Sequence, residues 1–154
     1  MTVQEAINQF RLILHDISDE YDDYHAIMRI NSAIALTCAL LVQIHSPLVM
    51  EEATFADGDA LPANFLRPAG TYPVKRTGQT VEFLDGSEEM KIRYFVTKDK
   101  VSAATDEMPF AHDTINDFIV RTACKLALNR NEFDISQDQG ILTELQNAAA
   151  AAMG

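Results

Sequence analysis

The sequence has few of the residues that common nucleotide and redox sites require. It holds 6 glycines in 154 residues, and neither a GxGxxG nor a GxxxxGK pattern occurs. Because those patterns bring the backbone close to phosphates, nucleotide binding by these routes is not predicted. There is no tryptophan, and the 2 cysteines, Cys38 and Cys124, sit among apolar residues at helical spacing. We expect both to be reduced core cysteines, as in a cytosolic protein.

Basic residues are also scarce, with 12 lysines and arginines against 23 acidic residues and a formal net charge of -11. The acidic excess lies towards the ends: 2 basic against 6 acidic residues over 1–50, and 3 against 8 over 101–154. Nucleic-acid binding depends on basic side chains that neutralise phosphates. The excess of acidic over basic residues therefore argues against a phosphate-binding surface. No charged segment followed by an apolar run opens the sequence, so no signal peptide is expected.

A first helix is predicted from about Val3 to Ile17. Thr2 and Glu5 have the spacing of a capping box, in which each side chain bonds the other residue's backbone N–H. Apolar residues then recur on one helical face. The acidic segment from Ser18 to His25 is expected to join this helix to the next.

A second helix is predicted from about Tyr24 to Ile44, capped by Asp22 or Asp23 and ended by Ser46-Pro47. Its half from Ala33 to Ile44 carries no charge. That half is shorter than the roughly 20 residues that cross a membrane. We therefore expect it to be buried by its own fold or by a neighbouring subunit.

The middle of the chain predicts a loop and then β-structure. Residues 48–65 are expected to form a loop with a short helical or extended piece near its start, and Asp57-Gly58-Asp59 predicts a turn. Residues 80–84 and 89–97 have strand patterns, and Asp85-Gly86 between them is typical of a hairpin turn.

Residues alternate along the second of these strands. Met90, Ile92, Tyr94 and Val96 are predicted to face the core, and Lys91, Arg93, Phe95 and Thr97 the other side. The surface formed by Lys91, Arg93 and Phe95 is a possible contact surface. Stacking on single-stranded nucleic acid is one interpretation of it, but packing within a hairpin is favoured because the chain is acidic.

The chain is organised around residues 110–129, where Asp113 is a candidate N-cap. The apolar positions that follow cover more than one side of a helix: Ile115, Phe118, Ile119, Val120, Ala123, Cys124, Leu126, Ala127 and Leu128. Such a wide stripe indicates burial on several faces, so we expect the other helices and a β-hairpin to pack against it. A last helix is predicted after a cap at Asp134 or Ser136, running through Leu145 into an alanine run at 148–152.

These elements define the predicted fold class. It is α+β and mainly α, with four main helices, two N-terminal and two C-terminal, around a central β-hairpin or small antiparallel sheet. We expect residues 1–154 to form a single domain, in which 136–154 is a C-terminal helix with an alanine-rich tail.

The candidate chemical sites lack the spacing that their chemistry needs. Six residues of metal-ligating types gather at the acidic junction: His15, Asp16, Asp19, Asp22, Asp23 and His25. They show neither the HExxH pattern nor a glycine-centred calcium loop, so a solvated helix junction is favoured. A cysteine nucleophile, Cys124 with His112 or Cys38 with His45, is disfavoured because nothing flanks either thiol that would stabilise a thiolate. We predict no catalytic, metal-binding or cofactor-binding residue and no enzyme activity.

The order of elements carries a resemblance to a known family. The marking residues are Arg29-Ile30-Asn31-Ser32-Ala33, Leu61-Pro62-Ala63-Asn64-Phe65, Val81, Phe83, Ile92, Tyr94, Val96, Pro109-Phe110, Ala123 and Ala127-Leu128. In this order, over most of the chain, the sequence resembles the head-to-tail adaptor (connector, head-completion) proteins of tailed bacteriophages. The alanine-rich end departs from that pattern.

The resemblance implies a structural virion protein without catalytic residues. Such proteins form a ring, typically a dodecamer, that binds the portal protein, extends the DNA channel without sequence-specific DNA binding and receives a neck or tail protein. The implied location is the neck at the portal vertex, and the host cytoplasm during assembly, with no membrane. Candidate partner or subunit interface residues are Ile34, Leu40, Leu41, Ile44, Leu142, Leu145, Ala148 and Ala149. The alternative is a small helical homo-oligomeric interaction or regulatory module without a virion role.

Overall fold

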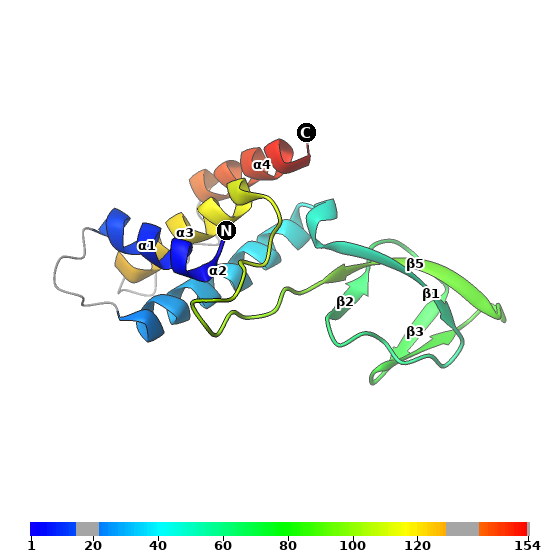
Figure 1. Ribbon diagram of the computed structural model, residues 1–154. Coiled ribbons are helices and arrows are strands. Elements are labelled where there is room, and N and C mark those ends of the chain that lie inside the picture. The colour runs from blue at the N-terminus through cyan, green and yellow to red at the C-terminus, as the bar shows by residue number, and fades with distance from the viewer. Residues whose placement is uncertain (15–21, 129–138, 154) are drawn as a thin grey trace. The chain divides into compact units, whose positions relative to one another are not determined.

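The computed structural model describes residues 1–14, 22–128 and 139–153 (Figure 1). Four helices are present in this part of the chain: α1 (Val3–Leu14), α2 (Asp23–Gln43), α3 (Asp113–Leu128) and α4 (Gln139–Met153). Between α2 and α3 come a short 3-10 helix, η1 (Pro47–Val49), and the strands β1 (Met50–Ala56), β2 (Phe65–Pro68), β3 (Val74–Thr77), β4 (Thr80–Phe83) and β5 (Glu89–Val96). The predicted fold class, α+β with two helices on either side of a small antiparallel sheet, is confirmed.

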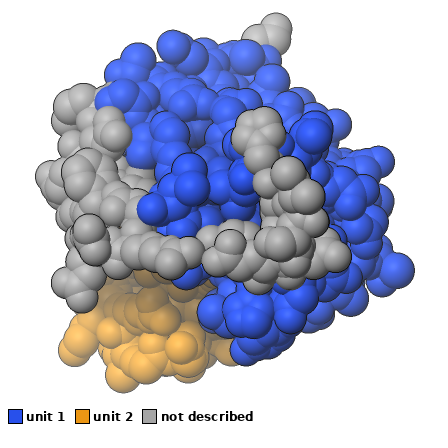
Figure 2. All heavy atoms as spheres, turned by 90° about the vertical axis from the view of Figure 1, so that its left-hand side faces the viewer, with its two compact units in different colours: residues 1–44, 98–154 blue, residues 45–97 orange. Residues whose placement is uncertain are grey.

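The chain divides into two compact units, coloured separately in Figure 2. Unit 1 contains residues 1–44 and 98–154, and unit 2 contains residues 45–97. Unit 2 is therefore inserted in the sequence between the two helix pairs of unit 1. The prediction of a single folding domain stays a prediction.

In unit 1, α3 packs against α1, α2 and α4. The side chains of Phe118 and Ile119 are at most 1% exposed. Ile115, Val120, Ala123, Cys124 and Ala127 are buried as well, whereas Leu128 is 72% exposed. The wide apolar stripe of α3 is therefore buried against three helices, and the predicted packing of the other helices against it is confirmed. The strands form unit 2, which has a core of its own, and the predicted packing of a β-hairpin against this helix stays a prediction.

The predicted starts of the first three helices agree with α1, α2 and α3 to within one residue. Thr2 and Glu5 form the capping box: the Thr2 N–H donates to Glu5 Oε2 at 3.0 Å and the Glu5 N–H to Thr2 Oγ1 at 3.2 Å. Asp22 caps α2 by accepting a hydrogen bond from the His25 N–H at 2.9 Å. Asp113 is the first residue of α3 rather than its cap, and its carboxylate accepts from the Asn116 side chain at 3.3 Å. The candidate caps of α4, Asp134 and Ser136, lie outside the described residues.

The segment that leads into α3 is tied to both N-terminal helices. Two N–H groups in the first turn of α1 donate to carbonyls of this segment. The Val3 N–H donates to the Asp106 carbonyl at 2.8 Å, and the Gln4 N–H to the Ala104 carbonyl at 3.0 Å. On α2, the Asn31 amide donates to the Val101 carbonyl and accepts from the Val101 N–H, both at 2.8 Å. An irregular segment is thereby held by the backbone of α1 and by the Asn31 side chain of α2, which satisfies groups that burial would otherwise leave unpaired.

In unit 2, β5 is the central strand of a three-stranded antiparallel sheet with the order β1-β5-β2. β3 and β4 form a separate hairpin. Its turn contains Gly78 at a φ of +60°, a conformation that glycine adopts without steric cost. Both sheets contribute side chains to one core, formed by Phe55, Leu61, Phe65, Val81, Ile92, Tyr94 and Val96.

The predicted hairpin across Asp85-Gly86 is wrong. Gly86 does take a positive φ of 77°, but the turn links strands of different sheets. β4 pairs instead with β3 across the tight turn at Gly78-Gln79, while β1 pairs along β5 on one edge and β2 pairs with residues 94–96 on the other. Of the two alternatives predicted near the start of the preceding loop, the extended piece is confirmed: it is strand β1, which pairs with β5 over seven residues.

Candidate functional site

The interface residues predicted on α2 lie mostly inside the subunit. Ile34, Leu40 and Leu41 are at most 2% exposed. They belong to unit 1, where α2 packs against α3 and α4. Their role as interface residues is therefore corrected: of the two alternatives for this uncharged half-helix, burial by its own fold holds at these positions. Ile44 at the end of the helix is only partly buried and stays a candidate.

From Met28 onwards, the outer face of α2 is exposed and carries no charge. It consists of Met28, Ser32, Ala35, Ala39 and Gln43. By length and composition α2 is apolar enough to cross a membrane, with a mean hydropathy of 1.6 over its most apolar stretch, but 44% of that stretch is buried inside the chain. Core helices of soluble proteins commonly have this composition, so the observation does not favour a membrane span.

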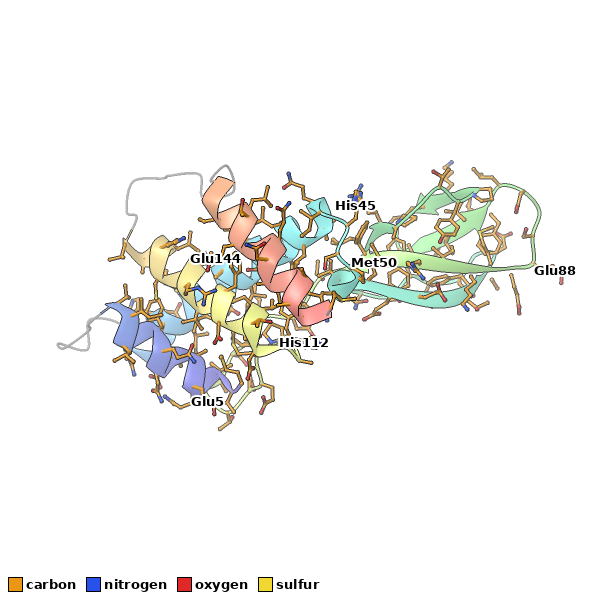
Figure 3. The ribbon with its side chains drawn as sticks, turned by 90° about the horizontal axis from the view of Figure 1, so that it is seen from above. Glu5, His45, Met50, Glu88, His112 and Glu144 are labelled. Atoms are coloured by element: carbon orange, nitrogen blue, oxygen red, sulfur yellow. The ribbon has the colours of Figure 1, made fainter. Side chains whose placement is uncertain are left out.

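The C-terminal helix has one packed side and one open side. Leu145 is fully buried and Ala149 is 6% exposed, so both fill the subunit's own core rather than an interface. Leu142 and Ala148 are partly buried and stay candidates. Glu144, labelled in Figure 3, pairs with two basic residues of α3: its carboxylate lies 2.6 Å from Arg121 Nε and 3.9 Å from Lys125 Nζ.

The open side of α4 is uncharged. It includes Gln146, Asn147, Ala150 and Ala151, and Met153 at its end is 54% exposed. The alanine run therefore presents both a packed and an open surface.

The predicted basic contact surface on β5 is partly neutralised within its own sheet. Lys91 Nζ and Arg93 Nε lie 3.0 and 3.5 Å from the Glu52 carboxylate on β1. The hydrogen bond from Lys91, followed by the charges of Lys91 and Arg93, lowers the pKa of Glu52. Lys91 and Arg93 are exposed as predicted, and the single Glu52 carboxylate balances one of their two positive charges.

Phe95 does not belong to that surface. Its side chain is 2% exposed, so its assignment to a contact surface is corrected. The Arg67 guanidinium lies 5.2 Å from the centre of its ring, and the His45 ring meets it edge-on at 5.7 Å. Strand alternation alone predicts that this side chain points away from the core, whereas Arg67 and His45 of neighbouring segments contact its ring.

Unit 2 contains a cavity that the sequence analysis missed. It has a volume of about 260 Å³ and is mainly apolar, with two arginines in its lining. The lining residues are Leu61, Phe65, Leu66, Arg67, Pro68, Val74, Arg76, Val81 and Ile92. These residues come from β2, β3, β4, β5 and the segment before β2, so only the pairing of the strands brings them together.

The two cysteines are free and buried, as predicted. Burial raises the pKa of the Cys124 thiol to about 11 and also raises the pKa of Cys38. Both thiols are therefore protonated at neutral pH, which disfavours nucleophilic chemistry.

The acidic junction is only partly within the described residues, since His15, Asp16 and Asp19 lie outside them. Asp22 is engaged by the backbone and ring of His25, and Asp23 pairs with Arg11 at 3.0 Å. Over residues 1–14, 22–128 and 139–153, no three histidine, cysteine or acidic side chains are grouped to hold a metal ion.

Comparison with known proteins adds no relative. No protein-family model matches the chain, and no curated protein matches it significantly.

Proposed function

We propose that this chain is a head-to-tail adaptor, a structural virion protein that assembles as a ring on a portal. The observation that supports the proposal most is the order of elements: a helix pair, an inserted β unit and a second helix pair. This order is the one that the resemblance to phage connector proteins implies. The proposed partners are the portal protein, a neck or tail protein and further copies of the chain.

The exposed surfaces of unit 1 suit assembly. A ring uses a heterologous interface, in which each subunit presents two different faces. The uncharged outer face of α2 and the uncharged open side of α4 are two such faces on different helices. Ile44, Leu142 and Ala148 lie partly exposed on these helices or at their ends. The net charge of -11 would also repel DNA phosphates from a channel wall and let DNA slide.

We assign portal docking to the end of α4. Removing residues 146–154 is expected to abolish portal binding while the rest of unit 1 keeps its fold, because Ile141 and Leu145 remain to pack. A less disruptive variant is Ala150→Glu, which places a charge on the open side without touching the packed one. Thr143→Glu, also exposed on α4 but closer to its start, is the matched control.

The assay is a pull-down with the portal protein encoded in the same genome. We expect portal protein to retain the full chain and the Thr143→Glu variant. We expect it not to retain the Ala150→Glu variant or the truncated chain. Normal retention of the truncated chain would refute docking through α4. A full chain that ignores portal protein and forms a small stable dimer would instead favour the interaction module.

A further inference from the structure

The cavity of unit 2 is small, apolar at its centre and positively charged at its rim. Its volume of about 260 Å³ lies below the roughly 300–1,000 Å³ of typical small-molecule sites. Phe65, Val81 and Ile92 are at most 7% exposed and form its apolar floor. A space of this size suits one or two side chains of a protein partner better than a cofactor.

The two arginines of the cavity have no acidic partner. Arg76 is fixed by hydrogen bonds to neutral oxygens only: the carbonyls of Gly78 and Leu66 at 3.0 and 3.2 Å and Gln79 Oε1 at 3.2 Å. Arg67 lies over the Phe95 ring. Neither arginine makes an ion pair with any residue that the structure describes. In a chain with nearly twice as many acidic as basic residues, two unpaired guanidiniums beside an apolar space indicate an occupant that carries carboxylates.

The chain itself presents such a segment. We call residues 82–89 the acidic turn, because Glu82, Asp85, Glu88 and Glu89 surround Leu84, which is 66% exposed. None of these four carboxylates pairs with a cation among the described residues, and Figure 3 shows Glu88 on the loop between β4 and β5. Asp85 closes the turn by accepting from the Ser87 N–H at 3.0 Å. An exposed leucine flanked by unpaired carboxylates is the chemical complement of the cavity.

We propose that the cavity of unit 2 receives the acidic turn of a second copy of this chain, with Leu84 on the apolar floor and the neighbouring carboxylates facing Arg67 and Arg76. Leucine burial supplies a hydrophobic contribution, and the charge pairs orient the two copies. The proposal rests on the self-association that the adaptor function includes, and it is independent of the portal protein.

The test is disulfide capture between two single-cysteine variants. A tagged Leu66→Cys chain, with the new thiol at the cavity rim, is mixed with an untagged Ser87→Cys chain, which keeps Leu84, under mild oxidation. The native cysteines are buried and do not compete. The control pairs Leu66→Cys with Leu12→Cys, because Leu12 is 75% exposed but lies on α1, away from the acidic turn in the sequence. We expect about a tenfold higher yield of the mixed disulfide for the first pair, the equivalent of roughly 1.4 kcal/mol.

Charge variants then test the orientation. Arg67→Glu on the Leu66→Cys chain should reduce the yield to the control value, and Glu88→Arg on the Ser87→Cys chain should restore it. Arg67 is preferred to Arg76 because Arg76 holds the hairpin turn, and Asp85 is left intact because it closes the acidic turn. Lys75→Glu makes the same charge change on β3, outside the cavity lining, and should leave the yield unchanged.

Equal yields for the Ser87 and Leu12 pairs, or no response to Arg67→Glu, would overturn the proposed contact. The portal pull-down separates this result from the adaptor function. If the chain is retained on portal protein but the disulfide does not form, only this proposed contact is refuted. If the disulfide forms but the chain does not bind portal protein, only the proposed adaptor function is refuted.

Discussion

The hydrogen-bonded pair between Asn31 and Val101 is expected to be a main determinant of unit 1 stability. Asn31 makes two 2.8 Å hydrogen bonds with the backbone of a residue 70 positions further along the chain. Val101 itself is 5% exposed, so water has little access to replace these bonds. Asn31 lies in the middle of α2, and its side chain bonds Val101 and not the backbone of its own helix.

The expected cost of Asn31→Ala follows from this geometry. Truncation leaves the N–H and the carbonyl of Val101 without their partner, and each unpaired buried group costs about 1–3 kcal/mol. Partial access of water at the half-buried Asn31 reduces the sum, so we expect a loss of about 2–4 kcal/mol in the free energy of unfolding. The measurement is urea denaturation of the full chain, followed by far-ultraviolet circular dichroism.

Ser32→Ala is the matched control. Ser32 is the next residue of α2, is exposed, and donates only within its own helix, to the Met28 carbonyl at 3.1 Å. We expect its change to stay within about 0.5 kcal/mol. A similar small loss for Asn31→Ala would refute the reasoning.

Asn31→Asp supplies a second readout. An ionised carboxylate still accepts from the Val101 N–H but repels the Val101 carbonyl, so the folded-state pKa of the new acid is expected to be raised. The variant should therefore regain stability relative to the wild type as pH falls through that pKa.

Two further predictions address the core and the acid response of unit 1. Phe118→Ala should cost about 3–5 kcal/mol by urea denaturation because Phe118 is 1% exposed, whereas Leu128→Ala on the same helix, at 72% exposure, should change little; equal losses would contradict the assignment of the core. Hydrogen bonds from the backbone of Ser102, followed by that of Ala103, lower the pKa of Asp106. Its stabilising contribution is therefore present above the unfolded-state pKa of about 4 and is lost as pH falls through the lower folded-state pKa, so Asp106→Asn should flatten the loss of stability in an acid titration. An unchanged titration would show that the Asp106 hydrogen bonds do not contribute.

The local signals in the sequence predicted the helices well. The capping box of Thr2 and Glu5, the Asp22 cap and the apolar stripe around Phe118 depend on residues within one or two turns of each other. The β unit depends on distant pairing. The Asp85-Gly86 turn is a sound local prediction, yet β4 pairs with β3, and β5 pairs with β1 and β2, which are distant from it in the sequence.

The candidate interfaces show a second limit of sequence reasoning. The apolar composition of Ile34 and Leu41 indicates burial but cannot tell whether the subunit or a neighbour provides it. By strand alternation, Phe95 should point away from the core. It is nevertheless buried, and Arg67 and His45 from other segments contact its ring. The cavity of unit 2 has no sequence signature, because its lining residues share neither a periodic spacing nor a single element.

The central claim is that this chain assembles on a portal. The most direct measurement is negative-stain electron microscopy of purified portal protein mixed with the full chain, with mass photometry of the same sample. The account predicts rings of this chain seated on the portal, and a mass that rises by a whole ring. Portal particles without added density, beside a stable small dimer of this chain, would contradict it.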